Sequence, residues 1–364
     1  MPLSRLIVSN LRNLKQVELT PHPRLNLIYG ENGSGKTSLL EAVNVLGLGR
    51  SFRSHRPKPI INYDADRMTL YGEVSGGRIA RIGVEKTRQG DSTIRVDGRN
   101  VLSAAELAEH LPVLSLNAGS FELINGPPKL RRQLLDWLAF HVEPNFLKTW
   151  RDLQYCLKQR NSLLRRGRIS DFELRPWDKQ LVALAAEIDA IRRASFGPFL
   201  HAVEALDGLL SDVGDIVLDY RRGWKSGEDY QDLLENSFEQ DILRGYTQTG
   251  PHRADIRISL NGENAADVLS RGQQKVVVSA LVVALGVVFN RMTEKQVIFL
   301  VDDLPAELDA AHSRQLGQWL ASLNAQVFVT GVEKASLTAM WSEQQLGQAA
   351  GFHVEHGEVA QQSF

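Results

Sequence analysis

The first part of the chain shows short apolar segments separated by polar turns, a pattern typical of β-strands. One helical segment interrupts them, over residues 38–46, directly behind the third strand. Asp97-Gly98 is a tight-turn dipeptide after the last long strand and before Val101. The expected strands cover residues 3–8, 17–19, 25–29, 68–74, 79–85 and 92–96.

From about Leu116 the apolar positions follow a helical period. Leu181, Leu184, Ile188 and Ile191 recur at the spacing of one helix face. Proline and glycine interrupt this region, so we expect a compact helical insert and no pair of long coiled-coil arms. The interrupting residues are Pro144, Gly167, Pro176, Gly197, Pro198 and Gly214.

Strand-like segments return near Gly250. Residues 256–260 alternate. The wholly apolar run 297–301 and the apolar run Gln326–Thr330 indicate buried parallel strands. The apolar run Val276–Phe289 is shorter than the roughly 20 residues that a membrane span needs, so it predicts a buried helix. The pattern predicts one α/β lobe built from both ends of the chain, residues 1–115 and 251–364, with a helical lobe, residues 116–250, inserted.

Composition narrows the class of protein. The 364 residues carry a formal net charge of −1, so any contact with nucleic acid depends on local basic patches. A single cysteine, Cys156, excludes an intramolecular disulfide and a multi-cysteine zinc site. The first ten residues lack the apolar core of a signal peptide. We therefore expect a cytoplasmic protein with no membrane partner.

Gly30–Thr37 reads GENGSGKT and fits the phosphate-binding pattern G-x-x-x-x-G-K-[ST]. It follows an apolar strand and opens a helix, the context in which backbone N–H groups surround phosphates. Lys36 is expected to reach the β- and γ-phosphates, and Thr37 to bind Mg²⁺ through its hydroxyl. The predicted ATP-binding residues of this loop are Gly30, Glu31, Asn32, Gly33, Ser34, Gly35, Lys36 and Thr37.

Asp302 ends the apolar strand 297–301, the position of a Walker B carboxylate that holds Mg²⁺ with Thr37. Asp303 takes the place where ABC ATPases usually carry a glutamate that orients the attacking water. An aspartate is one methylene shorter, so slow hydrolysis is one expectation. The alternative is that both aspartates only cap the following helix.

The pentapeptide Leu269-Ser-Arg-Gly-Gln273 differs by one residue from the ABC signature L-S-G-G-Q. In that class Ser270, Gly272 and Gln273 would meet the ATP held by a second subunit. Ser270 is also a natural N-cap for the following helix, and both roles can coexist. Together with the other two motifs, the pentapeptide predicts an α/β fold with an ABC-type P-loop ATPase head and an inserted compact helical lobe.

At this point the chain resembles the RecF family of bacterial DNA-repair and recombination ATPases over nearly all of its length. Several matching segments, above all Gly250–Asp255, are not general ABC features. The resemblance rests on Asn10–Asn13, Gly30–Thr37, Gly49–Arg53, Asn125-Gly126, Lys129–Arg132, Leu135–Trp137, Gly250–Asp255, Leu269–Gln273, Asp302–Asp309 and Phe352–Gly357.

The resemblance implies a slow ATPase that uses ATP and Mg²⁺ and forms an ATP-dependent homodimer. It implies binding to double-stranded, gapped or single-stranded DNA, cooperation with RecR- and RecO-type mediators in loading RecA, and a nucleoid-associated place in the cytoplasm. Arg12 and Asn13 would lie near the nucleotide, and Asp309, in the D-loop, would act across the dimer interface. The family of ABC ATPases also has a switch histidine, but Thr330-Gly331 stands here instead. No Q-loop glutamine is assignable near residues 115–120.

Two basic clusters are candidates for DNA contacts, and each is equally well explained as a solvated surface. The first contains Arg50, Arg53, His55, Arg56 and Lys58. The second contains Lys158, Arg160, Arg165, Arg166 and Arg168. His252 is interpreted as a structural turn residue and Cys156 as a helix core residue.

Three other functions compete with an ATP-driven DNA-repair switch. The first is the cytosolic ATPase subunit of a transporter, which predicts no DNA affinity. The second is a DNA-bridging protein of the SMC type, which the broken helical insert disfavours. The third is a sensor that binds nucleotide without hydrolysing it, which the intact Lys36, Thr37 and Asp302 disfavour.

Overall fold

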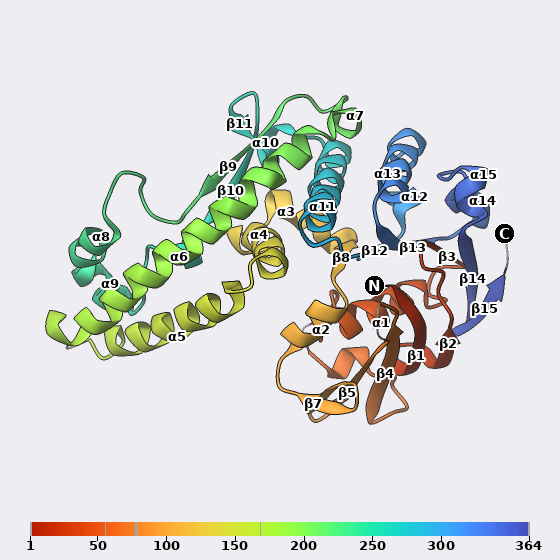
Figure 1. Cartoon of the computed structure of the whole chain (residues 1–364), viewed down its shortest axis with the longest axis horizontal. Coiled ribbons are helices and arrows are strands. Elements are labelled where there is room, and N and C mark those ends of the chain that lie inside the picture. Colours follow the sequence, from red (N-terminus) through yellow and green to blue (C-terminus); the bar gives the residue numbers. More distant parts are fainter. Residues whose placement is uncertain (1, 55, 77–78, 168, 363–364) are drawn as a thin grey trace. The chain divides into compact units, whose positions relative to one another are not determined.

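The computed structural model describes residues 2–54, 56–76, 79–167 and 169–362, and within them the chain forms two compact units (Figure 1). The first unit contains the chain up to Phe121, the short segment Leu206–Asp212 and everything from Ser270 onward. The second unit contains Glu122–Ala205 and Val213–Leu269.

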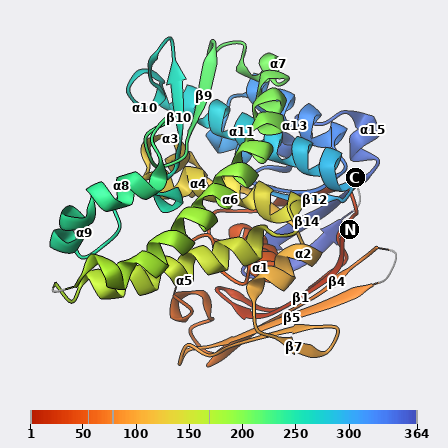
Figure 2. The ribbon, with the colours of Figure 1, turned by 60° about the vertical axis from the view of Figure 1, so that its left-hand side comes forward.

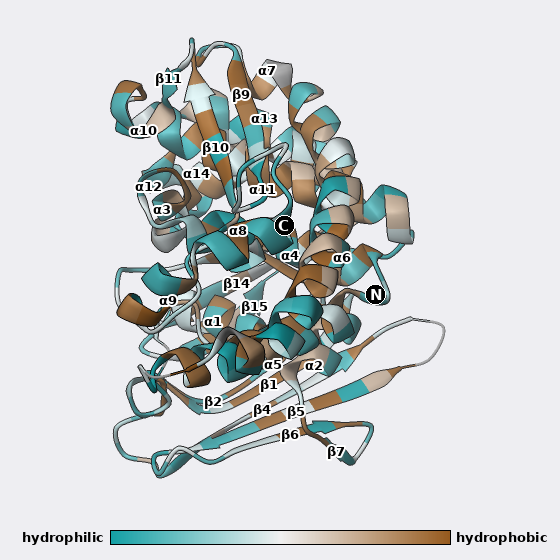
Figure 3. Ribbon diagram, turned by 90° about the vertical axis from the view of Figure 1, so that its left-hand side faces the viewer, coloured by the Kyte–Doolittle hydropathy of each residue, from teal (hydrophilic) through white to brown (hydrophobic). Residues whose placement is uncertain are grey.

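The first unit contains an antiparallel six-stranded sheet in the order β2-β1-β4-β5-β6-β7. Buried and exposed residues alternate along β4 and β5, and Figure 3 shows the matching alternation of hydrophobic and hydrophilic segments. The predicted turn Asp97-Gly98 joins β6 to β7, with positive φ at both residues. The strands are β1 (Leu3–Leu11), β2 (Leu14–Leu19), β4 (Arg67–Val74), β5 (Ala80–Thr87), β6 (Ser92–Val96) and β7 (Arg99–Val101).

A second six-stranded sheet in this unit has the order β15-β14-β3-β13-β12-β8. All of its neighbouring pairs are parallel except β14 with β15. Every residue of β3, β12 and β13 is buried, which explains why their sequences are mainly apolar, with Asn26, Gln326 and Thr330 as polar exceptions. The strands are β3 (Leu25–Tyr29), β8 (Val113–Leu116), β12 (Val297–Val301), β13 (Ala325–Gly331), β14 (Ala349–Glu355) and β15 (Glu358–Gln362).

Helix α1 (Lys36–Leu48) contacts strands of both sheets, and its apolar side chains belong to the core that joins them. Helices α11, α13 and α14 pack against the parallel sheet, and Figure 1 shows α11 and α13 beside β12 and β13. The helices are α2 (Ala104–His110), α7 (Asp207–Leu210), α11 (Arg271–Thr293), α12 (Leu304–Glu307), α13 (Ala310–Ser322), α14 (Lys334–Thr338), α15 (Glu343–Leu346), and the 3₁₀ turns η1 (Lys58–Ile60) and η2 (Ala118–Phe121).

Helix α11 is long and apolar enough to cross a membrane by length and composition alone, yet 78% of its most apolar stretch is buried inside the fold. Residues from Val276 to Phe289 are all buried. The prediction of a buried helix there is confirmed.

The second unit combines helices with a three-stranded antiparallel sheet in the order β11-β10-β9. Its core lies between α5 and α6, which run side by side in Figure 2, and includes the buried Cys156. The elements are α3 (Glu122–Asn125), α4 (Pro128–Val142), α5 (Phe146–Leu164), α6 (Asp171–Glu204), β9 (Ile216–Arg221), α8 (Tyr230–Asn236), α9 (Phe238–Arg244), η3 (Pro251–Arg253), β10 (Asp255–Leu260), β11 (Glu263–Asn264) and α10 (Ala265–Val268).

Two features of this unit differ from the sequence-based expectation. Helix α6 is 34 residues long and continues through Pro176 and Pro198, although an interior proline costs about 3 kcal/mol. Burial of Leu181, Ile188 and Phe199 along the same helix outweighs that local cost. Strand β10 pairs with β9, so residues 255–260 lie in the second unit and not in the lobe built from the chain ends.

Candidate functional site

The predicted phosphate-binding loop lies between β3 and α1, where a fully buried strand gives way to a helix N-terminus. Gly30, Gly33 and Gly35 all have positive φ, at 151°, 80° and 124°. A Cβ at Gly30 would lie 2.1 Å from the carbonyl oxygen of Val354, so no larger residue fits. The Ser34 hydroxyl is buried without a hydrogen-bond partner. This loop has the backbone shape and the free donor that fit a phosphate chain.

Lys36 is the first residue of α1 and is 7% exposed. Its ammonium group donates hydrogen bonds to the carbonyl oxygens of Gly30 and Glu31, at 2.7 and 2.8 Å. Burial lowers the pKa of Lys36, while the charges of Asp303 and Asp302 oppose this shift. The Lys36 ammonium group is therefore fixed beside the loop, near the carboxylates of Asp302 and Asp303.

Thr37 connects this loop to the end of β12. Its hydroxyl donates to Asp302 Oδ1 at 2.9 Å, and the Thr330 hydroxyl donates to the same oxygen at 2.8 Å. Thr330 in turn accepts a hydrogen bond from the backbone N–H of Asp303, at 2.8 Å. Thr330 occupies the position at which ABC ATPases usually carry the switch histidine. Its hydroxyl is hydrogen-bonded to both Asp302 and Asp303.

Asp303 has the left-handed conformation, with φ at 51°, at the start of α12. Burial raises the pKa of its carboxyl group, and the negative charges of Asp302 and Glu307 add to the rise, which Lys36 opposes. Among the described residues, no cluster of three or more His, Cys, Asp or Glu side chains is arranged to hold a metal ion. One carboxylate and one hydroxyl still suit Mg²⁺, which usually completes its shell with water and substrate phosphates.

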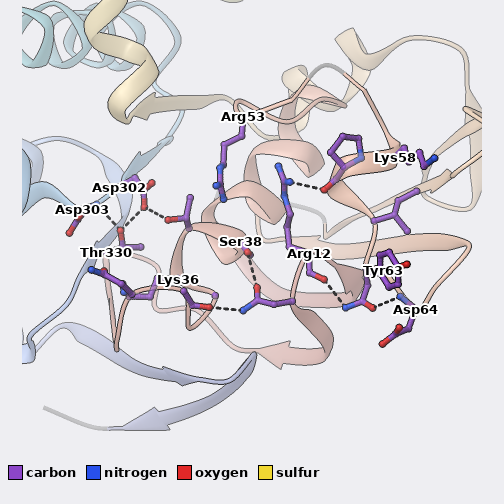
Figure 4. A pocket seen from close by; sticks show the side chains of 18 of the residues that line it. Arg12, Lys36, Ser38, Arg53, Lys58, Tyr63, Asp64, Asp302, Asp303 and Thr330 are labelled. Atoms are coloured by element: carbon purple, nitrogen blue, oxygen red, sulfur yellow. Dashed lines mark hydrogen bonds between the residues drawn. The ribbon is translucent and has the colours of Figure 1, made fainter.

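These groups line one cavity of about 940 Å³ in the first unit. Figure 4 shows Lys36, Asp302, Asp303 and Thr330 toward one end, and Tyr63 and Asp64 toward the other. The far wall was not foreseen from the sequence, because no motif marks it. It is formed by Arg53, Lys58, Pro59, Ile61, Asn62, Tyr63, Asp64 and Arg88.

Arg12 and Asn13 lie in this cavity, next to the loop. The guanidinium of Arg12 makes two 2.9 Å hydrogen bonds to the buried carboxylate of Glu41, on α1. The Ser51 hydroxyl also donates to Glu41. Sequence reasoning missed Glu41, since a lone glutamate in an apolar helix belongs to no motif.

Asn13 holds the loop from outside, because its amide donates to the carbonyl oxygens of Gly33 and Ser34 at 3.1 and 2.9 Å. The turn between β14 and β15 closes the other side, and the Gly357 N–H donates to Ser34 O at 2.9 Å. A Cβ at Gly357 would lie 2.3 Å from the Asn13 carbonyl oxygen. The C-terminal segment Phe352–Gly357 thus shapes the phosphate-binding loop.

The signature residues lie at the start of α11 and do not line the cavity. Ser270 is the N-cap of α11, with a capping box in which Ser270 and Gln273 exchange hydrogen bonds at 3.0 and 3.3 Å. Gly272 is exposed. Asp309 caps α13 and contacts His312 at 2.6 Å, again outside the cavity. Gln273 also donates to the Asp212 carbonyl oxygen at 3.4 Å.

The basic candidates separate into different environments. Arg53 lines the cavity, while Arg50 and Arg56 are exposed and lie outside its lining. In the other cluster Arg160 is fully buried and paired with Asp178 and Asp241, so the expectation that it could contact DNA is wrong. His55 and Arg168, named in the two clusters, lie outside the described residues.

Comparison with known proteins places the chain in a family. The family described as RecF/RecN/SMC N terminal domain matches residues 2–352. The chain is 49% identical over 362 residues, 99% of both chains, to the DNA replication and repair protein RecF of Cellvibrio japonicus (strain Ueda107). It is 47% identical over 363 residues to RecF of Pseudomonas aeruginosa (strain LESB58), covering 99% of this chain and 98% of that protein.

Solved structures of other proteins share the fold of this chain. A structure of the recombination mediator protein RecF with ATPrS, in the RecFOR pathway, has a TM-score of 0.83 at 25% identity and covers 99% of this chain and 98% of its own. An SMC head bound to a winged-helix domain of ScpA shares the fold, with a TM-score of 0.61 at 15% identity, covering 100% of this chain and 98% of that chain. These matches confirm the predicted α/β class. The chain belongs to the RecF family of DNA replication and repair proteins.

Proposed function

We propose that this chain is an ATP-dependent DNA-binding protein of replication and recombinational repair. The observation that carries the proposal is the 2.9 Å hydrogen bond between Thr37 and Asp302, beside the buried Lys36. It joins the phosphate-binding loop to the second metal-binding position of a P-loop ATPase.

ATP would be held by the Gly30–Thr37 loop, with Arg12 and Asn13 beside it, and Mg²⁺ by Thr37 and Asp302. A bound Mg²⁺ supplies charge neutralisation for the phosphates. Lys36 would add a cation at the β- and γ-phosphates. Asn13 and Gly357 hold the loop backbone in the required shape.

Hydrolysis would be slow and would use Asp303 to orient water. Its carboxyl group has a raised pKa and lies beside Lys36 and Asp302, but it is one methylene shorter than glutamate. The left-handed backbone at Asp303 sets its direction, and the Thr330 hydroxyl fixes its N–H.

ATP would also join two subunits. Ser270, Gly272 and Gln273 lie outside their own cavity and are open to solvent or half-buried, as residues that serve a partner's nucleotide must be. Asp309 would cross the same interface. The γ-phosphate can drive dimerisation only by touching both subunits, because a ligand shifts an equilibrium through differential affinity.

The DNA would be double-stranded, gapped or single-stranded, with Arg50, Arg53 and Arg56 as candidate contacts. The proposed partners are RecR- and RecO-type mediators and RecA, in a nucleoid-associated cytoplasmic setting. Relatives named as DNA replication and repair proteins favour this function over a transporter's ATPase subunit.

Light scattering with ATP and Mg²⁺ tests the switch. Wild type should dimerise, and Lys36→Met should remain monomeric because it loses the cation that meets the phosphates. Lys148→Met is the matched control, since Lys148 is 83% exposed on α5 and should dimerise normally. Equal dimerisation of Lys36→Met and wild type would contradict the proposal.

A further inference from the structure

The segment Gly250–Asp255, which is part of the resemblance to the RecF family, does not line the cavity beside the Gly30–Thr37 loop. Its backbone is fixed by close packing in the second unit. Gly250 has φ at 127°, and a Cβ there would lie 2.2 Å from Tyr230 Oη. Tyr230 donates to the Thr249 carbonyl oxygen at 2.7 Å, and Gly250 N–H donates to Gly223 O at 3.0 Å. These contacts fix the conformation of the turn.

Three arginines from α4 and α6 hold the rest of the segment. Arg192 donates to the Pro251 carbonyl oxygen at 2.7 Å, and Arg132 donates to the Ala254 carbonyl oxygen at 2.7 Å. Arg131 forms a two-point ion pair with Asp255, at 2.7 and 3.1 Å. All three guanidinium groups bind the turn itself, either its backbone carbonyl oxygens or the side chain of its last residue, Asp255.

His252 connects the turn to a second fixed segment. Its Nε2 contacts the Thr247 carbonyl oxygen at 3.0 Å, and burial lowers the pKa of His252 to about 4, so the ring is neutral and can donate there. Thr247 is itself held by Arg160, at 2.8 Å from its hydroxyl, and by Asn161, at 2.8 Å from its N–H. These contacts anchor the backbone after Tyr246, and on its other side the Gly245 N–H donates to the Asp241 carbonyl oxygen at 2.8 Å.

Arg253 is the member of the segment whose side chain faces outward. It is exposed, and its Cζ lies 5.3 Å from the centre of the Tyr246 ring. A hydrogen bond from Arg244, with the charges of Arg244 and Arg253, lowers the pKa of the Tyr246 hydroxyl. A Cβ at Gly245 would lie 3.1 Å from Arg165 Cγ, so a third arginine is close.

Charge is not neutralised within this cluster. Across the described part of the chain, no ion pair with an acidic side chain involves Arg165, Arg244 or Arg253. A guanidinium has five N–H donors, so Arg253 keeps donors for a phosphate beside its contacts with Tyr246. The side chains of Arg253 and Tyr246 stand on fixed backbone, so the backbone needs no further ordering on binding.

We propose that Arg253, Arg244 and Arg165, arranged around Tyr246, form a binding site for the backbone phosphates of DNA. This site rests on the proposed function, since it supplies a DNA surface in the second unit. The contact is with phosphates and is independent of base sequence.

Fluorescence anisotropy with ATP and Mg²⁺ tests the site, using two duplexes of unrelated sequence over a salt series. Each duplex phosphate contact gives a slope of about −0.9 in log affinity against log salt, so about 3.5-fold loss per contact for fourfold more salt. When salt rises fourfold, the factor by which the affinity of Arg253→Gln falls should therefore be about 3.5 times smaller than the wild-type factor, on both duplexes. For Arg253→Gln with Arg244→Gln the factor should be about 12 times smaller.

Arg99→Gln, which removes the same charge from an exposed position in the other compact unit, should keep the wild-type slope. Arg253→Lys should keep most of the slope but bind more weakly, because lysine lacks the planar set of N–H donors of the guanidinium. Thermal unfolding should be unchanged in Arg253→Gln, since the turn is held by other groups.

Wild-type duplex binding with an unchanged slope in Arg253→Gln would overturn this site and leave the proposed function standing. A wild type that binds no DNA would overturn both. Wild-type binding to polyglutamate without binding to duplex would overturn the phosphate site in favour of an acidic protein partner.

Discussion

Replacing Glu41 with glutamine tests the contact that holds Arg12 in the cavity proposed to bind ATP. The Glu41 side chain is 0% exposed and accepts two hydrogen bonds from Arg12 and one from Ser51. Glutamine has nearly the same size but carries no charge and offers one acceptor oxygen. Arg12 would then keep a buried positive charge without its counter-ion.

The expected loss follows from these contacts. Removing one partner of a buried ion pair costs about 3–5 kcal/mol. The Arg12 side chain is 21% exposed, so water solvates part of it, and glutamine retains one hydrogen bond. We therefore expect Glu41→Gln to lower the free energy of unfolding by about 2 kcal/mol. ATP affinity should fall as well, because the Ser51 hydroxyl, which donates to Glu41, accepts a hydrogen bond from the N–H of Arg53 on the cavity wall.

Urea unfolding measures the stability, and nucleotide titration measures the affinity. The control is Glu18→Gln, whose partner Arg5 is 43% exposed and whose own side chain is 57% exposed. A surface pair of this kind contributes about 0.5 kcal/mol or less. If Glu41→Gln costs no more than Glu18→Gln, the reasoning about the buried clamp is refuted.

Three further predictions concern the same unit. Thr330→Val removes the hydroxyl that joins Asp302 to the N–H of Asp303, and should cost about 2–4 kcal/mol in urea unfolding and slow ATP hydrolysis, whereas Thr330→Ser should retain both. Because the pKa of Asp303 is raised, its ionised form destabilises the fold, and this penalty disappears as pH falls through that raised pKa. ATP hydrolysis should decline over the same pH range, above the pH at which an ordinary aspartate titrates. A decline only at lower pH would argue against Asp303 as the group that orients water. Gly286→Ala would put a Cβ 2.4 Å from Cζ of Phe299 and should destabilise by about 1–3 kcal/mol, and an unchanged urea midpoint would show that the Phe299 ring yields freely.

The sequence predicts most of the proposed nucleotide site because its residues belong to local patterns. The loop Gly30–Thr37 carries its own spacing. Because β3 and β12 are buried along their whole length, β12 is wholly apolar and β3 is apolar except at Asn26. Thr330 could be placed near the end of the apolar strand 326–330, but its hydrogen bond to Asp302 could not be predicted from the missing histidine.

The rest depends on contacts between distant residues. Glu41 and the wall from Asn62 to Asp64 become visible only when segments far apart in sequence meet. Strand β10 was recognisable by its alternation, but its partner β9 was not, because pairing is set by non-local register. The length of α6 was underestimated because the local cost of proline is visible in a sequence while the compensating burial is not.

The central claim is that ATP held by Lys36 controls binding to DNA. Anisotropy of a labelled duplex, with and without ATP and Mg²⁺, tests it in wild type and Lys36→Met. We predict that ATP tightens wild-type binding by about 5-fold or more and leaves Lys36→Met unchanged. Equal DNA affinity of the wild type with and without ATP, or a full ATP response in Lys36→Met, would contradict the account.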